Sequence, residues 1–330
     1  MITVAALGTS AITRRTIAAA RGVDGLRFTT VASRDAARAA SLASELGLDA
    51  STLDAVLADP RIEAVYVATP NAVHAGQIRA ALDAGKHVLV EKPAVATASD
   101  WDEACQRASV RGVVLLENMR IDRDPVLARI AELLPTLGPI RRVAVGLSQR
   151  SSRYDDVLAG RRVNIFDPAL GGGALADIGV YVAHLVTQLF GTPTRVFACL
   201  VPIATGADGA GAALASYPGL VTELSWSKVS AGGEGGIIEG EDGTLWFDHV
   251  TELRSLSVEY RDGRRLDERP EKEPDNITYS LRRFASLAAS GEPATSGGAP
   301  AASDQARTRA TLALIERIRW AAEEEGPTES

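Results

Sequence analysis

The chain contains few of the residues that build disulfide frameworks or metal centres. Its 330 residues include two cysteines and four histidines. Cys105 and Cys199 lie far apart, and no Cys or His stands near them at the spacing of metal ligands. These absences exclude a disulfide-rich scaffold and favour a reducing compartment. We therefore expect no metal site and two buried thiols.

Long runs of one chemical character are also missing. The chain has 35 Lys and Arg against 42 Asp and Glu, a net charge of −7. No basic run is long enough to neutralise a row of phosphates, so we expect no nucleic-acid partner. The apolar segment 2–8 is too short to span a membrane, and no basic region precedes it as in a secretion signal. We expect no membrane partner and a cytoplasmic location.

The length exceeds what one hydrophobic core usually serves, so two domains are predicted. In residues 1–120, short Val- and Ala-rich runs alternate with longer amphipathic stretches, which is typical of a parallel sheet joined by crossover helices. The predicted strands are 3–7, 28–32, 64–68, 87–90 and 113–116, and the predicted helices are 12–21, 36–46, 74–84 and 99–109. Gly47 and Gly85 stand where left-handed helix ends are commonly needed.

The pattern changes in residues 121–330, where extended segments follow one another with few helices. The predicted strands are 140–149, 195–203, 220–230, 236–239, 243–250 and 254–260. They indicate a second, α+β domain with a mainly antiparallel open sheet. A long helix is predicted over 175–190 and a loop over 290–302. A last helix, 301–322, is a candidate for packing back on the first domain.

The turn after the first predicted strand lies where a dinucleotide-binding fold places its phosphate-binding glycines. It reads Gly8-Thr9-Ser10-Ala11-Ile12-Thr13. Only the first glycine is kept, since Ser10 and Thr13 stand where the second and third would be. Ser10 is small and adds a hydroxyl donor, and the next helix would aim its N-terminus at a pyrophosphate. An ordinary strand-to-helix turn explains the same residues equally well.

The end of the second predicted strand bears on which cofactor would bind. Ser33 and Arg34 stand where a carboxylate would hold the 2′-hydroxyl of NAD. A hydroxyl and a guanidinium suit a 2′-phosphate instead, so NADP(H) is favoured and NAD(H) stays an alternative. Asp35 is expected to cap the following helix. The other interpretation of Arg34 is a solvated surface charge.

Two further strand ends carry polar residues at the edge where an open α/β sheet binds its ligand. They read Thr69-Pro70-Asn71, followed by His74, and Glu91-Lys92-Pro93. An ammonium at Lys92, beside a bound nicotinamide, would polarise a substrate oxygen or assist a nearby acid. A lone Lys before Pro is otherwise a turn residue.

A third polar cluster follows three consecutive glycines, Gly171 to Gly173. Asp177, Tyr181 and His184 are spaced i, i+4 and i+7, which predicts one shared helical face with a polar destination. The glycines would let the chain approach a ligand closely. The alternative is a capping Asp with a buried, hydrogen-bonded Tyr and His.

Together these segments resemble the Gfo/Idh/MocA oxidoreductase family, nearest its dihydrodiol and xylose dehydrogenase-like branch, and the resemblance spans nearly the whole chain. It implies a Rossmann domain, then a mainly β domain whose open sheet forms a homodimer or homotetramer interface. It implies that Lys92 is catalytic and that Asp177 and Tyr181 are the acidic and proton-transfer residues. It also assigns cofactor binding to the Gly8 turn and to the two strand-end segments, His74 included.

Further candidate substrate contacts lie elsewhere in the sequence. His184 is one, and Asn118 and Arg120 follow a predicted strand. The others lie in the polar segment 150–166 and are Arg153, Tyr154 and Asn164. The resemblance implies reversible hydride transfer between NADP(H) and a carbinol or carbonyl carbon of a sugar or polyol. Two alternatives stay open, namely reduction of a sugar-nucleotide ketone or an imine, and a non-catalytic NADP(H)-sensing protein.

Overall fold

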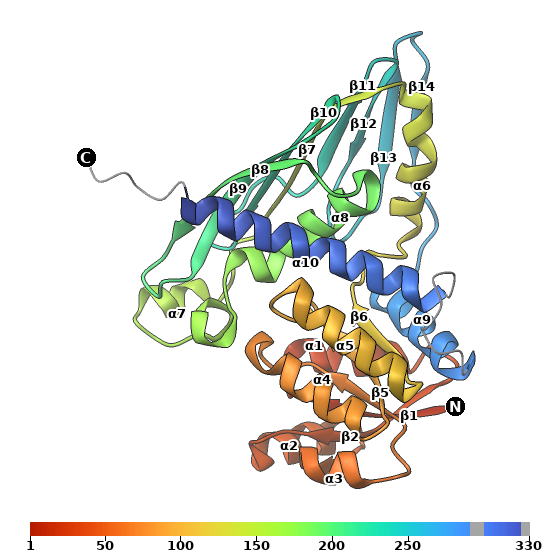
Figure 1. Cartoon of the computed structure of the whole chain (residues 1–330), viewed down its shortest axis with the longest axis vertical. Helices are drawn as coiled ribbons and strands as arrows, with labels where there is room; N and C mark the ends of the chain where they lie inside the picture. The colour runs from red at the N-terminus through yellow and green to blue at the C-terminus, as the bar shows by residue number, and fades with distance from the viewer. Residues whose placement is uncertain (291–299, 325–330) are drawn as a thin grey trace. The chain divides into compact units, whose positions relative to one another are not determined.

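The computed structural model describes residues 1–290 and 300–324, which form two compact units (Figure 1). Unit 1 holds residues 1–120 and the described part of 273–309, and unit 2 holds residues 121–272 and the described part from 310 onward. The sequence placed residues 121–330 in the second domain and named helix 301–322 as a candidate for packing back on the first, whereas the described part of segment 273–309 groups with the N-terminal residues. Of the predicted loop 290–302, residues 291–299 lie outside the described residues.

Unit 1 contains a six-stranded, all-parallel sheet in the order β3-β2-β1-β4-β5-β6. Its strands are β1 (Ile2–Leu7), β2 (Leu26–Ala32), β3 (Asp49–Ser51), β4 (Ala64–Val67), β5 (His87–Glu91) and β6 (Leu115–Asn118). Its helices are α1 (Ala11–Ala20), α2 (Ala36–Leu46), α3 (Leu53–Ala58), α4 (His74–Asp83), α5 (Ala98–Arg111), α9 (Ile277–Ser290) and the first part of α10 (Pro300–Glu324). The predicted parallel sheet of a Rossmann domain is therefore confirmed.

Local sequence signals explain the boundaries of these helices. Asp35 caps α2 by accepting the Arg38 N–H at 3.0 Å, as predicted. Gly47 and Gly85 have φ of +70° and +72°, the left-handed conformation expected of them. The core on one face joins α1 and α9 through Ile17, Leu281 and Phe284, and α9 also contacts β1 and β6. A helix distant in sequence thus completes the core of unit 1.

Unit 2 is built on an eight-stranded sheet in the order β14-β13-β12-β11-β7-β10-β9-β8. Its strands are β7 (Ile140–Ser148), β8 (Arg195–Pro202), β9 (Asp208–Tyr217), β10 (Leu220–Ser227), β11 (Gly236–Gly240), β12 (Gly243–Phe247), β13 (Leu256–Tyr260) and β14 (Arg265–Glu268). The β7–β10 pair is parallel and the other pairs are antiparallel. The mainly antiparallel sheet is confirmed.

The helices of unit 2 are α6 (Pro125–Leu133), α7 (Tyr154–Leu158), α8 (Val180–Phe190) and the rest of α10. Figure 1 shows α8 against the sheet, where it contacts β7 and β10. The helical stretch Pro168–Phe190 is long and apolar enough to cross a membrane, but 72% of its apolar window is buried inside the structure. That burial is typical of a core helix.

Candidate functional site

The order of the strands in unit 1 identifies the edge where a ligand would bind. The chain winds from β1 outward to β3 and then from β4 outward to β6, so β1 and β4 flank the point where the winding reverses. Open α/β sheets bind ligands at the carboxyl ends of the strands at this point. Gly8 lies there, with φ of +121°, and a Cβ on it would come within 2.3 Å of the Ala68 carbonyl oxygen. Only glycine fits this position.

The turn after Gly8 leads directly into α1. Ser10 is the N-cap, and its Oγ accepts the Thr13 N–H at 3.4 Å. Thr13, which stands where the family motif has a third glycine, is fully buried. The N-terminus of α1 therefore lies at the ligand-binding edge, and its main-chain N–H groups suit a pyrophosphate.

The end of β2 presents the predicted cofactor-selecting residues. Arg34 is exposed, while Ser33 is half-buried and its Oγ accepts the Asp35 N–H at 3.2 Å. An exposed guanidinium at this strand end suits an anionic group better than an uncharged hydroxyl. The turn at Gly8, the start of α1 and Arg34 together fit a phosphorylated dinucleotide.

His74 joins the loops that follow β4 and β5. It is fully buried, and its Nδ1 and Nε2 lie 3.1 Å from the Pro93 oxygen and 2.9 Å from the Thr69 oxygen. Burial lowers its pKa below the ordinary value. Both ring nitrogens thus contact main chain of unit 1, so His74 is not carried forward as a direct cofactor contact. Thr69, Pro70 and Asn71 are half-buried beside it.

A buried hydrogen-bond network supports the Glu91-Lys92-Pro93 segment. Glu91 Oε1 accepts the Tyr66 hydroxyl at 2.5 Å and the Asn118 Nδ2 at 2.6 Å. Burial, and then the Glu91 charge, raise the pKa of Tyr66 well above its usual value, which keeps the hydroxyl a donor. Asn118 is thus a buried partner of Glu91, and Lys92 is half-buried.

A second buried carboxylate supports the same segment from β6. Glu117 Oε1 accepts the Ala94 N–H at 2.8 Å, and its Oε2 accepts the Thr308 hydroxyl at 3.0 Å. Neither Glu117 nor Tyr66 was predicted from the sequence as a site residue. Their position beside the ligand-binding edge was a usable signal, because strand ends in a parallel sheet share that edge.

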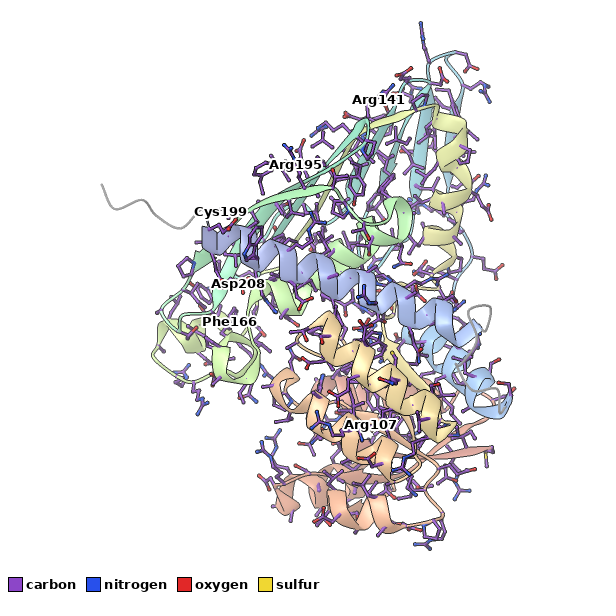
Figure 2. The ribbon with its side chains drawn as sticks, viewed as in Figure 1. Arg107, Arg141, Phe166, Arg195, Cys199 and Asp208 are labelled. Atoms are coloured by element: carbon purple, nitrogen blue, oxygen red, sulfur yellow. The ribbon has the colours of Figure 1, made fainter. Side chains whose placement is uncertain are left out.

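In unit 2 the glycine segment packs against the protein itself. A Cβ on Gly172 would lie 2.7 Å from the Asn164 and Ile165 oxygens, and one on Gly173 would lie 2.1 Å from Asp208 Oδ1. These contacts correct the interpretation that the glycines serve close approach to a ligand. Asp208, labelled in Figure 2, instead accepts the Leu175 N–H at 2.7 Å. Burial raises the pKa of this carboxyl.

The helix after the glycines begins with a π turn over Leu175–Gly179, and α8 follows. Asp177 lies in this turn, and its Oδ2 forms an ion pair with Lys228 Nζ at 2.8 Å. Lys228 follows β10, is 8% exposed and was missed by the sequence analysis. π turns interrupt the regular spacing of a helix and are frequent at functional sites.

Tyr181 and His184 continue along α8, and both are buried. His184 Nδ1 lies 3.0 Å from Thr311 Oγ1, and its Nε2 lies 3.4 Å from Asp122 Oδ1. Asp177 and His184 therefore face different elements of unit 2, contrary to one shared polar face. The ring nitrogens of His184 thus face side chains of unit 2, and we do not propose His184 as a substrate contact.

The remaining candidates are dispersed. Arg120 is half-buried in unit 1, whereas Arg153 and Asn164 are exposed in unit 2. Tyr154 packs in a small cluster with Phe166, labelled in Figure 2, with 5.7 Å between the ring centroids. No further feature of these residues singles out one of them as a substrate contact.

Comparison with known proteins identifies the relatives of both parts of the chain. Residues 2–119 match the model of an oxidoreductase family with an NAD-binding Rossmann fold, and residues 135–246 match the GFO/IDH/MocA C-terminal domain. A scyllo-inositol 2-dehydrogenase (NADP(+)) of Bacillus subtilis is 36% identical over 80% of this chain and 81% of that protein.

Two other relatives differ in the substrate that they are named for. A dTDP-3,4-didehydro-2,6-dideoxy-alpha-D-glucose 3-reductase of Streptomyces violaceoruber is 30% identical over 89% of this chain and 87% of that protein. This chain also resembles the crystal structure of a 3-ketoreductase from Actinomadura kijaniata in complex with NADP and TDP-benzene. The TM-score between the two structures is 0.85 and their sequence identity is 25%. The match covers 97% of each chain.

Proposed function

Because the chain belongs to the Gfo/Idh/MocA oxidoreductase family, we propose that it transfers a hydride reversibly between NADP(H) and a carbon of a sugar or polyol. The observation that carries this proposal is the turn at Gly8, where β1 and β4 flank the ligand-binding edge and α1 begins. The NADP-dependent inositol dehydrogenase among its relatives supports both the cofactor and the substrate class.

Arg34 selects NADP(H) in this proposal, since its exposed guanidinium suits a 2′-phosphate. Arg34→Ala is expected to raise the Kd of NADPH roughly tenfold or more and to change the Kd of NADH little, because a charge-assisted hydrogen bond is lost. Arg27→Ala is the matched control, an exposed arginine at the opposite end of β2. Equal NADPH affinity in wild type and Arg34→Ala contradicts this role.

Three side chains carry the proton chemistry in this proposal. The nicotinamide cofactor, when bound, supplies the hydride transfer. Tyr181 exchanges the proton of the substrate hydroxyl, Lys92 polarises a substrate oxygen, and Asp177 binds a second hydroxyl of the substrate. Lys92→Ala should lower kcat roughly a hundredfold or more. Near-normal turnover would refute the assignment.

The substrate class is tested by titrating NADPH and NADH and then assaying inositols, aldoses and keto sugars through the absorbance of the reduced nicotinamide. Turnover of scyllo-inositol or D-xylose supports the main proposal. The dTDP-sugar reductase among the relatives favours a second candidate, reduction of a sugar-nucleotide ketone, which the same assay covers with a keto-sugar nucleotide. Saturable NADPH binding without any turnover supports the sensor alternative. The cytoplasmic location stays a prediction.

We also propose that the open face of the unit 2 sheet pairs with a second copy of the chain. Cross-strand neighbours place Phe197, Leu214 and Trp246 on one face, with side chains 38–50% exposed. A hollow of about 620 Å³ lies on this face, and the strand residues that line it include Cys199, which is labelled in Figure 2. Exposed apolar area of this kind is typical of an interface.

Light scattering tests this pairing. Leu214→Glu places a charge on the face and should convert an oligomer to a monomer. Val110→Glu is the matched control, because Val110 is an exposed apolar residue of α5 in the other unit. A monomeric wild-type protein at high concentration contradicts the proposal.

A further inference from the structure

The ion pair between Lys228 and Asp177 is built into the fold of unit 2. The Lys228 side chain is 10% exposed and the Asp177 side chain 28%. The main chain of Lys228 is fixed on both sides, since its N–H donates to the Gly209 oxygen at 2.8 Å and its oxygen accepts the Ser151 N–H at 2.8 Å. The ammonium therefore reaches Asp177 from a rigid position.

Asp177, the acidic partner of this ion pair, lies in the turn that leads into α8. Asp177 lies in the π turn, whose first residue, Leu175, is held by Asp208 through its N–H. Lys228 Nζ lies 2.8 Å from Asp177 Oδ2, so its charge constrains the carboxylate directly. A nearby cation favours the ionised form of a carboxylate and fixes its direction.

We propose that Lys228 is a positioning residue of the substrate site, which fixes the direction of the Asp177 carboxylate so that it accepts a substrate hydroxyl. The inference rests on the proposed function, because it takes from it the role of Asp177. The inference adds Lys228 to the residues that determine substrate binding. Lys228 lies in the loop after β10, which contains none of the motifs identified in the sequence. The cation acts through Asp177 and does not itself contact the cofactor.

The main test compares Lys228→Met with Lys228→Arg, using the sugar that the wild type turns over fastest among scyllo-inositol, myo-inositol, D-xylose and D-glucose. Lys228→Met should lower kcat/KM roughly a hundredfold, the size expected when a binding group is misplaced by about 1 Å. Much of this loss should lie in KM, and the Kd of NADPH should stay within about twofold of wild type. Lys228→Arg, which keeps the cation, should recover most of the loss.

Lys272→Met is the matched control, because Lys272 forms an ion pair with the fully buried Asp124 in the same unit. It removes a comparable buried ammonium, so it reproduces the loss of stability that such a change causes. Urea unfolding of both variants measures that loss. The control should leave KM for the sugar near the wild-type value.

A double-mutant cycle separates positioning from general destabilisation. If Lys228 acts through Asp177, adding Lys228→Met to Asp177→Asn should cause little further loss of kcat/KM. The double variant removes both charges together, so it avoids the cost of leaving the half-buried Asp177 carboxylate without the Lys228 ammonium. Wild-type kinetics in Lys228→Met, or losses that multiply in the double variant, overturn the inference and leave the proposed function standing. A wild-type protein that binds NADPH and turns over no sugar overturns both.

Discussion

Removing the Tyr66 hydroxyl should weaken the support of the segment that carries Lys92. Tyr66 is fully buried on β4, and its hydroxyl donates to Glu91 at 2.5 Å and lies 3.0 Å from the Thr16 hydroxyl. In Tyr66→Phe the ring keeps its edge contact with Phe28, whose centroid is 6.0 Å away. The change therefore removes hydrogen bonds and little packing.

The expected loss of stability in Tyr66→Phe depends on the charge of the Glu91 carboxylate, which accepts the hydrogen bond. A hydrogen bond to a charged group contributes about 1.5–3 kcal/mol, against about 1 kcal/mol for an ordinary one. Glu91 keeps Asn118 as a donor, so we expect Tyr66→Phe to lower the free energy of unfolding of unit 1 by about 2 kcal/mol. Because the pKa of Tyr66 is raised by burial, the effect should not change between pH 6 and 8.

Urea unfolding followed by circular dichroism measures this loss, and hydrogen exchange of the β5 amides assigns it to unit 1. Tyr217→Phe is the matched control, because that hydroxyl donates at 3.2 Å to the neutral Gly191 oxygen at a more exposed position. It should cost no more than about 1 kcal/mol. If Tyr66→Phe costs no more than the control, the Glu91 network does not carry the stability that its geometry indicates.

Three other predictions follow from the same structure. Gly8→Ala should abolish NADPH binding measured by fluorescence, whereas Gly47→Ala, with open space around its Cβ, should bind normally and cost about 1 kcal/mol of stability. In the Leu214→Glu variant, in which the sheet face is not covered by a second copy, exposed Cys199 should react quickly with a disulfide reagent at pH 8, and Cys105 slowly, because burial raises the pKa of Cys105 to about 12; reaction of both at one rate would contradict this. Burial lowers the pKa of His74 and His87, so the unfolded chain binds protons that the folded chain does not. The free energy of unfolding should then fall as pH drops below about 6.5, and His74→Gln should flatten that slope in urea titrations from pH 5 to 8.

The elements that the sequence predicted correctly have strong local patterns. β1, β4 and β5 are apolar runs, and α2 has a cap at each end. β9 was missed because Asp208–Tyr217 consists mostly of Gly, Ala and Ser, which lack the β-branched residues that indicate a strand. The expectation of few helices in unit 2 missed α6, and α9 was missed although its apolar residues recur at helical spacing. The prediction of two buried thiols was wrong for Cys199, which is exposed on β8.

No local pattern shows where α9 packs. Its contacts with β1 and β6 join segments that are far apart along the chain. A composition shift after residue 120 therefore indicates a boundary and cannot indicate that α9 returns to the first unit. That return depends on a complementary apolar face, which is a property of the folded surface.

Candidate site residues in unit 1 could be predicted from the sequence, whereas Lys228 in unit 2 could not. The reason is that one sheet is parallel and the other mainly antiparallel. In a parallel sheet all strands end at one edge, so residues after β1, β2, β4 and β5 share that edge without any knowledge of register. In the antiparallel part of unit 2 successive strands end at opposite edges, and which residues meet depends on register and on where each strand stops. Lys228 reaches Asp177 because β10 ends at Ser227 and a π turn displaces the carboxylate. Neither feature has a signature in the amino-acid sequence, since a lone Lys after a strand usually is a solvated charge. Site residues that follow the strands of an antiparallel sheet are therefore the hardest to predict from the sequence, because their neighbours depend on the register.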